Sequence, residues 1–175
     1  MRRTREPSSH VLSAAPPSRR LSAMQLHPTA QRVQARLREL GLEVEVRELA
    51  DSTRTAGEAA AAVGVEVGQI VKSLVFVDDA GPLLCLCAGD RRVDTAKLGP
   101  GVRQARGDEV REATGFAIGG VPPVGHDRPL RSVVDASLRR FETVWCAAGT
   151  PHAVFPVATE ALIGAIRGAD VREVS

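Results

Sequence analysis

Lys72 is the residue whose type and position most strongly indicate chemistry. It interrupts an apolar run that predicts a β-strand over residues 69–77, and on such a strand it shares one face with Ile70, Leu74 and Phe76. Lysine is almost never fully buried without a partner. Lys72 is therefore either an edge lysine that reaches solvent and discourages strand pairing, or an ammonium at a pocket rim that holds a phosphate or a developing negative charge.

The choice of basic residues favours the second interpretation. The 175 residues include 23 Lys and Arg, and only Lys72 and Lys97 among them are lysines. Arginine forms planar, bidentate contacts, whereas lysine offers a compact point charge. A chain that uses arginine at almost every basic position, yet has lysine inside a strand, points to a role for that ammonium.

A second candidate is the loop from Gly119 to His126, which contains three glycines and two adjacent prolines. Glycines permit positive φ angles and close backbone approach, and prolines stiffen the turn between them. Such a loop either presents backbone N–H groups to a carboxylate, phosphate or oxyanion, or is a rigid surface turn. It lacks the Gly-Lys-Ser/Thr of a P-loop, and the chain has no dinucleotide-binding fingerprint.

Two histidines and the cysteines complete the set of reactive side chains. His126 closes the glycine-rich loop and His152 follows a Gly-Thr-Pro turn; each is a candidate to orient a water or an ester carbonyl, although a lone loop histidine is more often merely exposed. No metal-ligand spacing and no Gly-x-Ser-x-Gly elbow occurs, so the sequence predicts no metal, no cofactor and no serine hydrolase. Cys85 and Cys87 share a strand face and are predicted to be reduced core thiols of a cytoplasmic protein.

Periodic patterns predict the elements that position these residues. Helices are expected over 28–40, 55–63, 94–98, 108–114 and 159–166, with a helical turn at 136–140. The second of these begins at a capping box formed by Thr55 and Glu58. Strands are expected over 42–46, 69–77, 83–88, 102–105, 132–135, 143–147, 154–157 and 171–174. This irregular order predicts an α/β (mixed α+β) fold and argues against a doubly wound one.

Residues 1–23 differ from the rest of the chain. They carry five Arg and one Glu, which leaves 18 basic and 20 acidic residues, a net charge of −2, in 24–175. We expect 1–23 to be a disordered N-terminal extension or to precede a true start at Met24; a transit peptide or a nucleic-acid-binding arm are the alternatives. The domain is then expected to span 24–175. No apolar run approaches the ~20 residues of a membrane-spanning helix, so no membrane partner is expected.

The ordered segments of the chain resemble the YbaK/EbsC/ProX family of aminoacyl-tRNA deacylases, which is related to the editing insertion domain of bacterial prolyl-tRNA synthetase. The resemblance covers roughly residues 28–174. It implies a single compact domain on a curved mixed β-sheet with flanking helices. The matching segments are TAGEAAAAV (55–63), GQIVKSLVF (68–76), GDRRVDTAKL (89–98), ATGFAIGGVPPVGH (113–126), VDASL (134–138) and WCAAGTPHAVF (145–155).

The resemblance also implies roles for single residues. Lys72 corresponds to the family's lysine and would hold the phosphate or ribose of the terminal adenosine. The loop from Gly119 to Pro123 corresponds to the family's Gly-x-x-x-Pro loop, whose backbone would face the aminoacyl carbonyl. His152 falls where many relatives have Asn, so a positioning role is expected for it. The implied catalytic residues are Lys72, Gly119, Gly120 and His152, and the implied substrate-binding residues are Ser73, Pro122, Pro123, His126, Asp135 and Gly149.

The function that the resemblance implies is hydrolysis of the ester between a small wrong amino acid and its tRNA, with tRNA for proline as a candidate substrate. Prolyl-tRNA synthetase and an elongation factor are candidate partners, and a monomer or weak homodimer is expected. An aminoacyl ester is already activated, so positioning, oxyanion stabilisation and a bound water suffice without a protein nucleophile. A noncatalytic module that binds aminoacyl-tRNA or a nucleotide is the alternative. A Schiff-base enzyme that uses Lys72 has no other support in the sequence.

Overall fold

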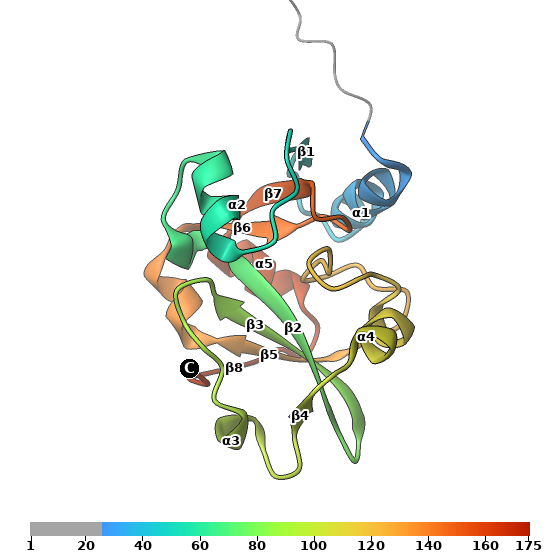
Figure 1. The fold of residues 1–175 in the computed structure, drawn as a ribbon, viewed down its shortest axis with the longest axis vertical. Coiled ribbons are helices and arrows are strands. Elements are labelled where there is room, and N and C mark those ends of the chain that lie inside the picture. Colours follow the sequence, from blue (N-terminus) through green and yellow to red (C-terminus); the bar gives the residue numbers. More distant parts are fainter. Residues whose placement is uncertain (1–25) are drawn as a thin grey trace, which may run out of the picture.

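The computed structural model describes residues 26–175, so the expected extension over 1–23 lies outside the described residues. Two sheets form its framework (Figure 1). The smaller sheet is antiparallel, in the order β1-β7-β6. The larger is mixed, in the order β4-β2-β3-β5-β8, with β2 antiparallel to both neighbours and β5 parallel to β3 and β8. An isolated bridge between Ile70 and Trp145 connects the two sheets.

The strands are β1 (Arg47–Glu48), β2 (Val71–Asp78), β3 (Gly81–Ala88), β4 (Arg103–Gln104), β5 (Arg131–Asp135), β6 (Thr143–Ala147), β7 (Ala153–Ala158) and β8 (Asp170–Arg172). The helices are α1 (Pro28–Glu39), α2 (Ala56–Val63), α3 (Thr95–Leu98), α4 (Gly107–Thr114) and α5 (Thr159–Ala165), with 3-10 turns η1 (Val67–Gln69) and η2 (Ala136–Arg140). The mixed α/β class is confirmed, and the expected curved sheet is divided into two.

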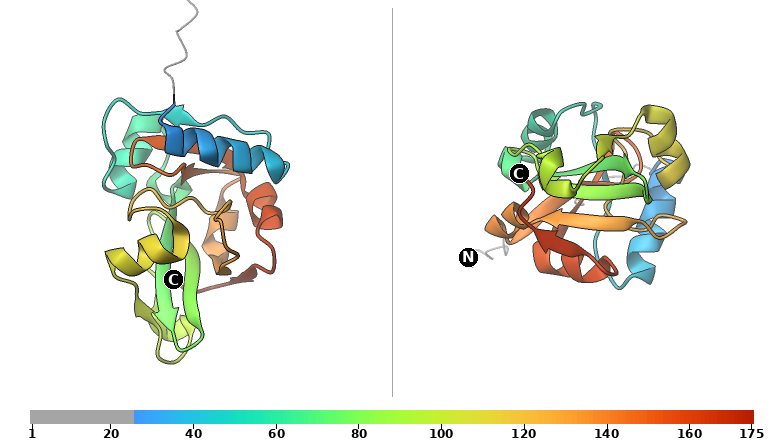
Figure 2. Two further views of the ribbon diagram at one scale, coloured as in Figure 1. Left: turned by 90° about the vertical axis from the view of Figure 1, so that its right-hand side faces the viewer. Right: turned by 90° about the horizontal axis from the view of Figure 1, so that it is seen from below.

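The views show how the helices cover the sheets. The smaller sheet and α1 lie at one end of the molecule, while the β2–β3 hairpin extends to the other (Figures 1 and 2). Helix α2 lies beside the start of β2 (Figure 1). Its N-terminus has the predicted capping box, in which Thr55 Oγ1 accepts from Glu58 N and the Glu58 carboxylate accepts from Thr55 N.

Strand β2 separates two apolar clusters. Val71 and Val75 belong to the main core, together with residues of α1, β3, β6 and β7. Phe76 lies in a smaller cluster with Leu83, Cys85, Leu98, Val133 and Val174, against which Leu74 packs. Lys72 pairs with Cys87 across the β2–β3 ladder, and its side chain belongs to the face of Leu74 and Phe76, as the alternation predicted.

The predicted strand over 42–46 is wrong. These residues form no ladder, and pairing begins only at Arg47. The side chain of Gln34 on α1 replaces a partner strand, because its amide donates to Val44 O (2.7 Å) and accepts from Val46 N (2.7 Å). Leu42 and Val46 are still buried, so the alternation correctly indicated which side chains face the core. Within residues 26–175, no helix is long and apolar enough to cross a membrane.

Candidate active site

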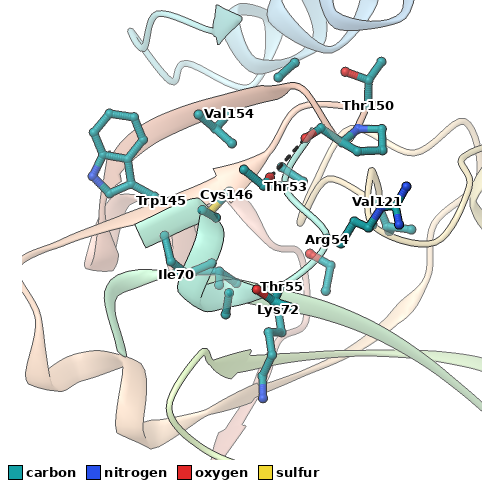
Figure 3. A pocket seen from close by; sticks show the side chains of 18 of the residues that line it. Thr53, Arg54, Thr55, Ile70, Lys72, Val121, Trp145, Cys146, Thr150 and Val154 are labelled. Carbon is teal, nitrogen blue, oxygen red and sulfur yellow. Dashed lines mark hydrogen bonds between the residues drawn. The ribbon is translucent and has the colours of Figure 1, made fainter. Parts of the chain in front are cut away.

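A pocket of about 310 Å³ lies where the two sheets meet (Figure 3). Strand β2 and the N-terminal part of α2 form one side, and β6, β7 and the loops around residues 118–121 and 150–151 form the other. Its volume is at the lower end of the range for small-molecule sites. The lining residues are Thr53, Arg54, Thr55, Ala56, Ala59, Val63, Ile70, Val71, Lys72, Ser73, Leu74, Ile118, Gly119, Val121, Trp145, Cys146, Ala147, Thr150, Pro151, Ala153 and Val154.

The chemical character of the lining is apolar with two cations. Among the described residues, Lys72 and Arg54 are the charged side chains of the lining, and no Asp or Glu contributes to it. A pocket of this kind favours a ligand that combines a small apolar or neutral group with a negatively charged one. This composition fits one end of a nucleotide that carries a small acyl group.

The segment that precedes α2 is fixed on both sides of Arg54. Thr53 donates from both N (3.1 Å) and Oγ1 (3.0 Å) to the carbonyl of Pro151. Arg54 N donates to Glu58 Oε2 (2.7 Å), and this bond and that from Thr55 N lower the pKa of Glu58. The backbone is therefore anchored, while the exposed Arg54 guanidinium makes no hydrogen bond or ion pair within residues 26–175.

Lys72 lies on the β2 side of the pocket with its ammonium directed away from Thr150 and Val154 (Figure 3). Its Nζ donates to the carbonyl of Arg91, in the loop after β3. That loop is tightly packed, because a Cβ on Gly89 would stand 2.2 Å from Val67 O. The exposed side chains of Arg91 and Arg92 extend the positive charge of Lys72 beyond the pocket.

The glycine-rich loop brings free backbone donors to the pocket. Gly119 has a φ of 87°, which favours glycine. The N–H of Gly120 donates to Ala117 O (3.0 Å), whereas those of Gly119 and Val121 donate to no acceptor in the described part of the chain. Both residues line the pocket. The prolines that follow have no N–H, so among the described loop residues that line the pocket, Gly119 and Val121 have an unused backbone donor.

Two loops are held in contact beside these donors. A Cβ on Gly120 would stand 2.7 Å from Gly149 O, and one on Gly149 would stand 2.8 Å from a methyl group of Thr29 and 3.1 Å from Val33. Gly149 also has a φ of 95°. Gly120 and Gly149 therefore do not line the pocket but set the spacing of loops that do.

The second half of the glycine-rich loop contains Pro122, Pro123 and His126, which stabilise it on the side away from the pocket. Pro122 and Pro123 are buried, and the carbonyl of Pro122 lies 2.8 Å from His126 Nε2, which donates to it. The ring of His126 meets Phe116 edge to face at 6.3 Å. Burial lowers the pKa of His126, although the Pro122 hydrogen bond and Asp127 oppose it. These three residues are outside the pocket lining.

Two further predicted site residues are not brought into the pocket. His152 follows Pro151 and is exposed; its carbonyl accepts from Leu49 N (2.6 Å). Asp135 is fully buried at the end of β5 and accepts from Ser137 Oγ (2.5 Å) and Val174 N (3.1 Å). Burial raises the pKa of Asp135, but these hydrogen bonds outweigh it and the net shift is downward.

Ser73 is the predicted residue with the most unusual surroundings. It lines the pocket, and its Oγ is shielded from solvent without a hydrogen-bond partner. Most buried hydroxyl groups are hydrogen-bonded, so the unpaired hydroxyl of Ser73 is an exception among buried polar groups.

Sequence reasoning missed Arg54, Ile118 and Thr150. Arg54 directly precedes the capping box, which places it at a helix start, but nothing in the pattern showed that this end faces β2. Ile118 is 63% exposed at the pocket edge, and its position before Gly119 was the available signal. Residues 26–175 contain no group of three or more His, Cys, Asp and Glu side chains arranged to hold a metal ion.

The mixed sheets and the cationic, apolar pocket define a small α/β domain with a candidate ligand site where its two sheets meet. The chain belongs to the aminoacyl-tRNA editing domain family, whose sequence model matches residues 50–165. This confirms the family resemblance and the predicted activity class, deacylation of mischarged aminoacyl-tRNA.

Similarity to individual proteins is consistent with this family assignment. The chain shares 51% sequence identity with a protein of known crystal structure that is described as a candidate trans-editing enzyme for prolyl tRNA synthetase. The two structures superpose with a TM-score of 0.80 over 86% of this chain and 99% of that one. It is 34% identical to the uncharacterized protein YwhH of Bacillus subtilis, over 69% of this chain and 80% of YwhH. It is 35% identical to proline–tRNA ligase of Lactobacillus gasseri, over 46% of this chain but only 15% of the ligase.

Proposed function

We propose that the protein acts in trans, on a separate tRNA that carries a small wrong amino acid, and that tRNA for proline or a similar tRNA is the substrate. The similarity to a candidate trans-editing enzyme and to a part of proline–tRNA ligase supports this proposal. Prolyl-tRNA synthetase or an elongation factor would deliver the tRNA. The proposal includes a cytoplasmic location and a monomer or weak homodimer.

The observation that carries the proposal is the pair of unused N–H groups of Gly119 and Val121 in an apolar pocket that also contains Lys72. The aminoacyl carbonyl would lie against these donors, which stabilise the negative charge that develops on its oxygen. Lys72 would bind the phosphate or ribose of the terminal adenosine, on the side of Arg91. His152, exposed after Pro151, would position the substrate from the pocket edge.

The reaction is an ester hydrolysis. A water attacks the aminoacyl carbonyl carbon, and the bond from that carbon to the ribose oxygen breaks. The ribose oxygen takes one proton of the attacking water and becomes a free hydroxyl, the amino acid leaves as a carboxylate, and the second proton is released to solvent. Among residues 26–175, the pocket lining offers no side-chain nucleophile with an adjacent base, so its contribution is to position the ester and to stabilise the oxyanion.

Deacylation assays on a panel of mischarged tRNAs test the proposal. Lys72→Ala is expected to lower kcat/KM by about a hundredfold or more, because the terminal adenosine, and with it the ester, is no longer held in position against the oxyanion donors. Lys97→Ala is the matched control, because it removes the other lysine, whose Nζ pairs with Glu173 (3.2 Å) outside the pocket lining. Equal rates for Lys72→Ala and the parent would contradict the role of Lys72. Saturable tRNA binding without turnover would favour the noncatalytic module.

A further inference from the structure

The turn that follows β3 holds the ammonium of Lys72. Lys72 Nζ makes its one hydrogen bond in the described part of the chain to the carbonyl of Arg91. Arg91 N donates to the carbonyl of Ala88 (3.0 Å), the last residue of β3, so the acceptor belongs to a closed turn with Gly89 and Asp90 at its centre. A lysine side chain has a flexible four-carbon stem, and a fixed acceptor therefore restricts where its ammonium lies.

Asp90, at the centre of this turn, is bound by Arg140 on η2. The two side chains form a bidentate ion pair, in which Arg140 Nη2 lies 2.7 Å from Asp90 Oδ1 and Nη1 lies 3.0 Å from Oδ2. Two parallel N–H···O bonds are stronger and more directional than a single contact. Hydrogen bonds from Arg140 also lower the pKa of Asp90, so the carboxylate stays ionised at neutral pH and the pair persists.

Arg140 is itself fixed by other contacts. Its Nε donates to Ser137 O (2.9 Å), and its guanidinium lies over the ring of Phe141, 4.9 Å from the ring centroid. Ser137 Oγ donates in turn to Asp135 (2.5 Å), which is fully buried at the end of β5. Asp135, a predicted site residue that lies outside the pocket, thus anchors the element that carries Arg140.

The 3-10 turn η1 packs against the turn after β3 as well. A Cβ on Gly68 would stand 3.0 Å from Asp90 Oδ2 and 2.6 Å from the ring of Phe141. A Cβ on Gly89 would stand 2.2 Å from Val67 O. The turn therefore has no room to move toward η1, and the ion pair with Arg140 fixes its other contacts.

We propose that Asp90 and Arg140 are positioning residues for the reaction, because their ion pair fixes the turn whose Arg91 carbonyl holds the Lys72 ammonium. The proposal rests on the deacylase function proposed above, in which Lys72 binds the phosphate or ribose of the terminal adenosine. Neither Asp90 nor Arg140 lines the pocket, so both act through Lys72 and not on the substrate. A charged group that must meet its ligand at one place is most effective when it is already held there.

Deacylation kinetics on a mischarged tRNA that the parent hydrolyses test the proposal. Arg140→Ala is expected to lower kcat/KM about tenfold, less than Lys72→Ala, because the ammonium remains but is no longer restricted to one position. Asp90→Asn should change kcat/KM in the same direction, and it tests the same contact if Arg140→Ala does not fold. Arg139→Ala is the matched control, since Arg139 lies on the same η2 turn but pairs with Glu160 (2.8 Å), and it should keep the parent rate.

A double variant separates positioning from general structural damage. In the Lys72→Ala background, Arg140→Ala should cause no further loss, because the group that it positions is absent. Arg140→Lys keeps the charge but not the bidentate geometry, so its rate should lie between those of the parent and Arg140→Ala. A tenfold loss that persists without Lys72 would overturn the proposal, as would a parent-like rate for Arg140→Ala alone.

The two lysines of the chain allow a readout that needs no substrate. Lys72 and Lys97 are its only lysines, so ¹³C-labelled lysine gives NMR signals from these two side chains alone. The Cε signal of Lys72 is expected to show restricted motion in the parent and faster motion in Arg140→Ala. Lys97, which pairs with Glu173 (3.2 Å), should not change. An unchanged Lys72 signal in Arg140→Ala would overturn the proposal. A parent that hydrolyses no aminoacyl-tRNA would instead refute the proposed function, and the NMR comparison would still decide whether the ion pair holds Lys72.

Discussion

Gly120 lies against the backbone of Gly149, so closely that a Cβ on Gly120 would stand 2.7 Å from the Gly149 carbonyl oxygen and 2.8 Å from its carbon. The atoms it would meet are backbone, which cannot move aside as the end of a side chain can. This contact joins the loop that carries the free N–H groups to the loop that leads into Thr150 and Pro151 on the pocket wall.

Gly120→Ala should therefore separate the two loops. The expected results are a loss of stability of about 1–3 kcal/mol, typical of overpacking, and a fall in kcat larger than the change in KM, because the oxyanion donors move. Chemical denaturation and deacylation kinetics measure the two effects. Gly164→Ala is the control: it lies in α5 with open space around its Cβ position and should stabilise by up to about 1 kcal/mol. A fully active Gly120→Ala protein would refute this account of the contact.

Arg54 provides a test of binding rather than chemistry. Its backbone is anchored by Glu58, but its guanidinium is exposed at the pocket edge. If the guanidinium binds the phosphate backbone near the tRNA terminus, Arg54→Ala should raise KM about two- to fivefold, as expected for an exposed charge pair, with little change in kcat. The salt dependence of KM should also weaken, since one fewer counterion is released. Arg111→Ala on the exposed side of α4, outside this pocket, is the control; an equal effect there would indicate a nonspecific contribution of net charge.

His126 makes stability depend on pH. Burial, its largest influence, lowers the pKa of His126 below the ordinary value of 6.5. Below about pH 6.5 the unfolded chain therefore binds a proton that the folded protein does not, so stability falls as the pH falls from 6.5 toward the lower folded pKa, and it is fully retained above 6.5. Tm measured between pH 8 and pH 5 should show this loss in the parent and in His152→Gln, whose site is exposed. His126→Gln should reduce it; an unchanged pH profile in that variant would assign the loss to other groups.

The sequence predicted most of the fold because its local signals agree with the final packing. The capping box at Thr55 and the alternation around Lys72 both have their expected geometry. The prediction of a strand over 42–46 was wrong for a reason that no local pattern contains. The side-chain amide of Gln34, on helix α1, makes the hydrogen bonds with Val44 and Val46 that a neighbouring strand would make.

The candidate site was less accessible to sequence reasoning. The glycine-rich loop was recognised, but which of its N–H groups remains available depends on the Gly120–Ala117 bond. The sequence also gave no sign that Asp135 and Val174 would pair inside the protein, or that Arg54 would lie opposite β2. These relationships depend on how distant segments meet, which composition and periodicity do not encode.

The bridge between Ile70 and Trp145, the one isolated bridge within residues 26–175, has a consequence for how the site can diverge. The pocket walls belong to two sheets whose ladders are otherwise separate, so residues on β6 and β7 can change in size without altering the β2–β3 register that pairs Lys72 with Cys87. The strand pairing that positions Lys72 is thereby separate from the strand pairing of the cavity wall formed by β6 and β7. Substitutions on β6 and β7 can therefore change which acyl group the pocket accepts while the protein keeps the same reaction.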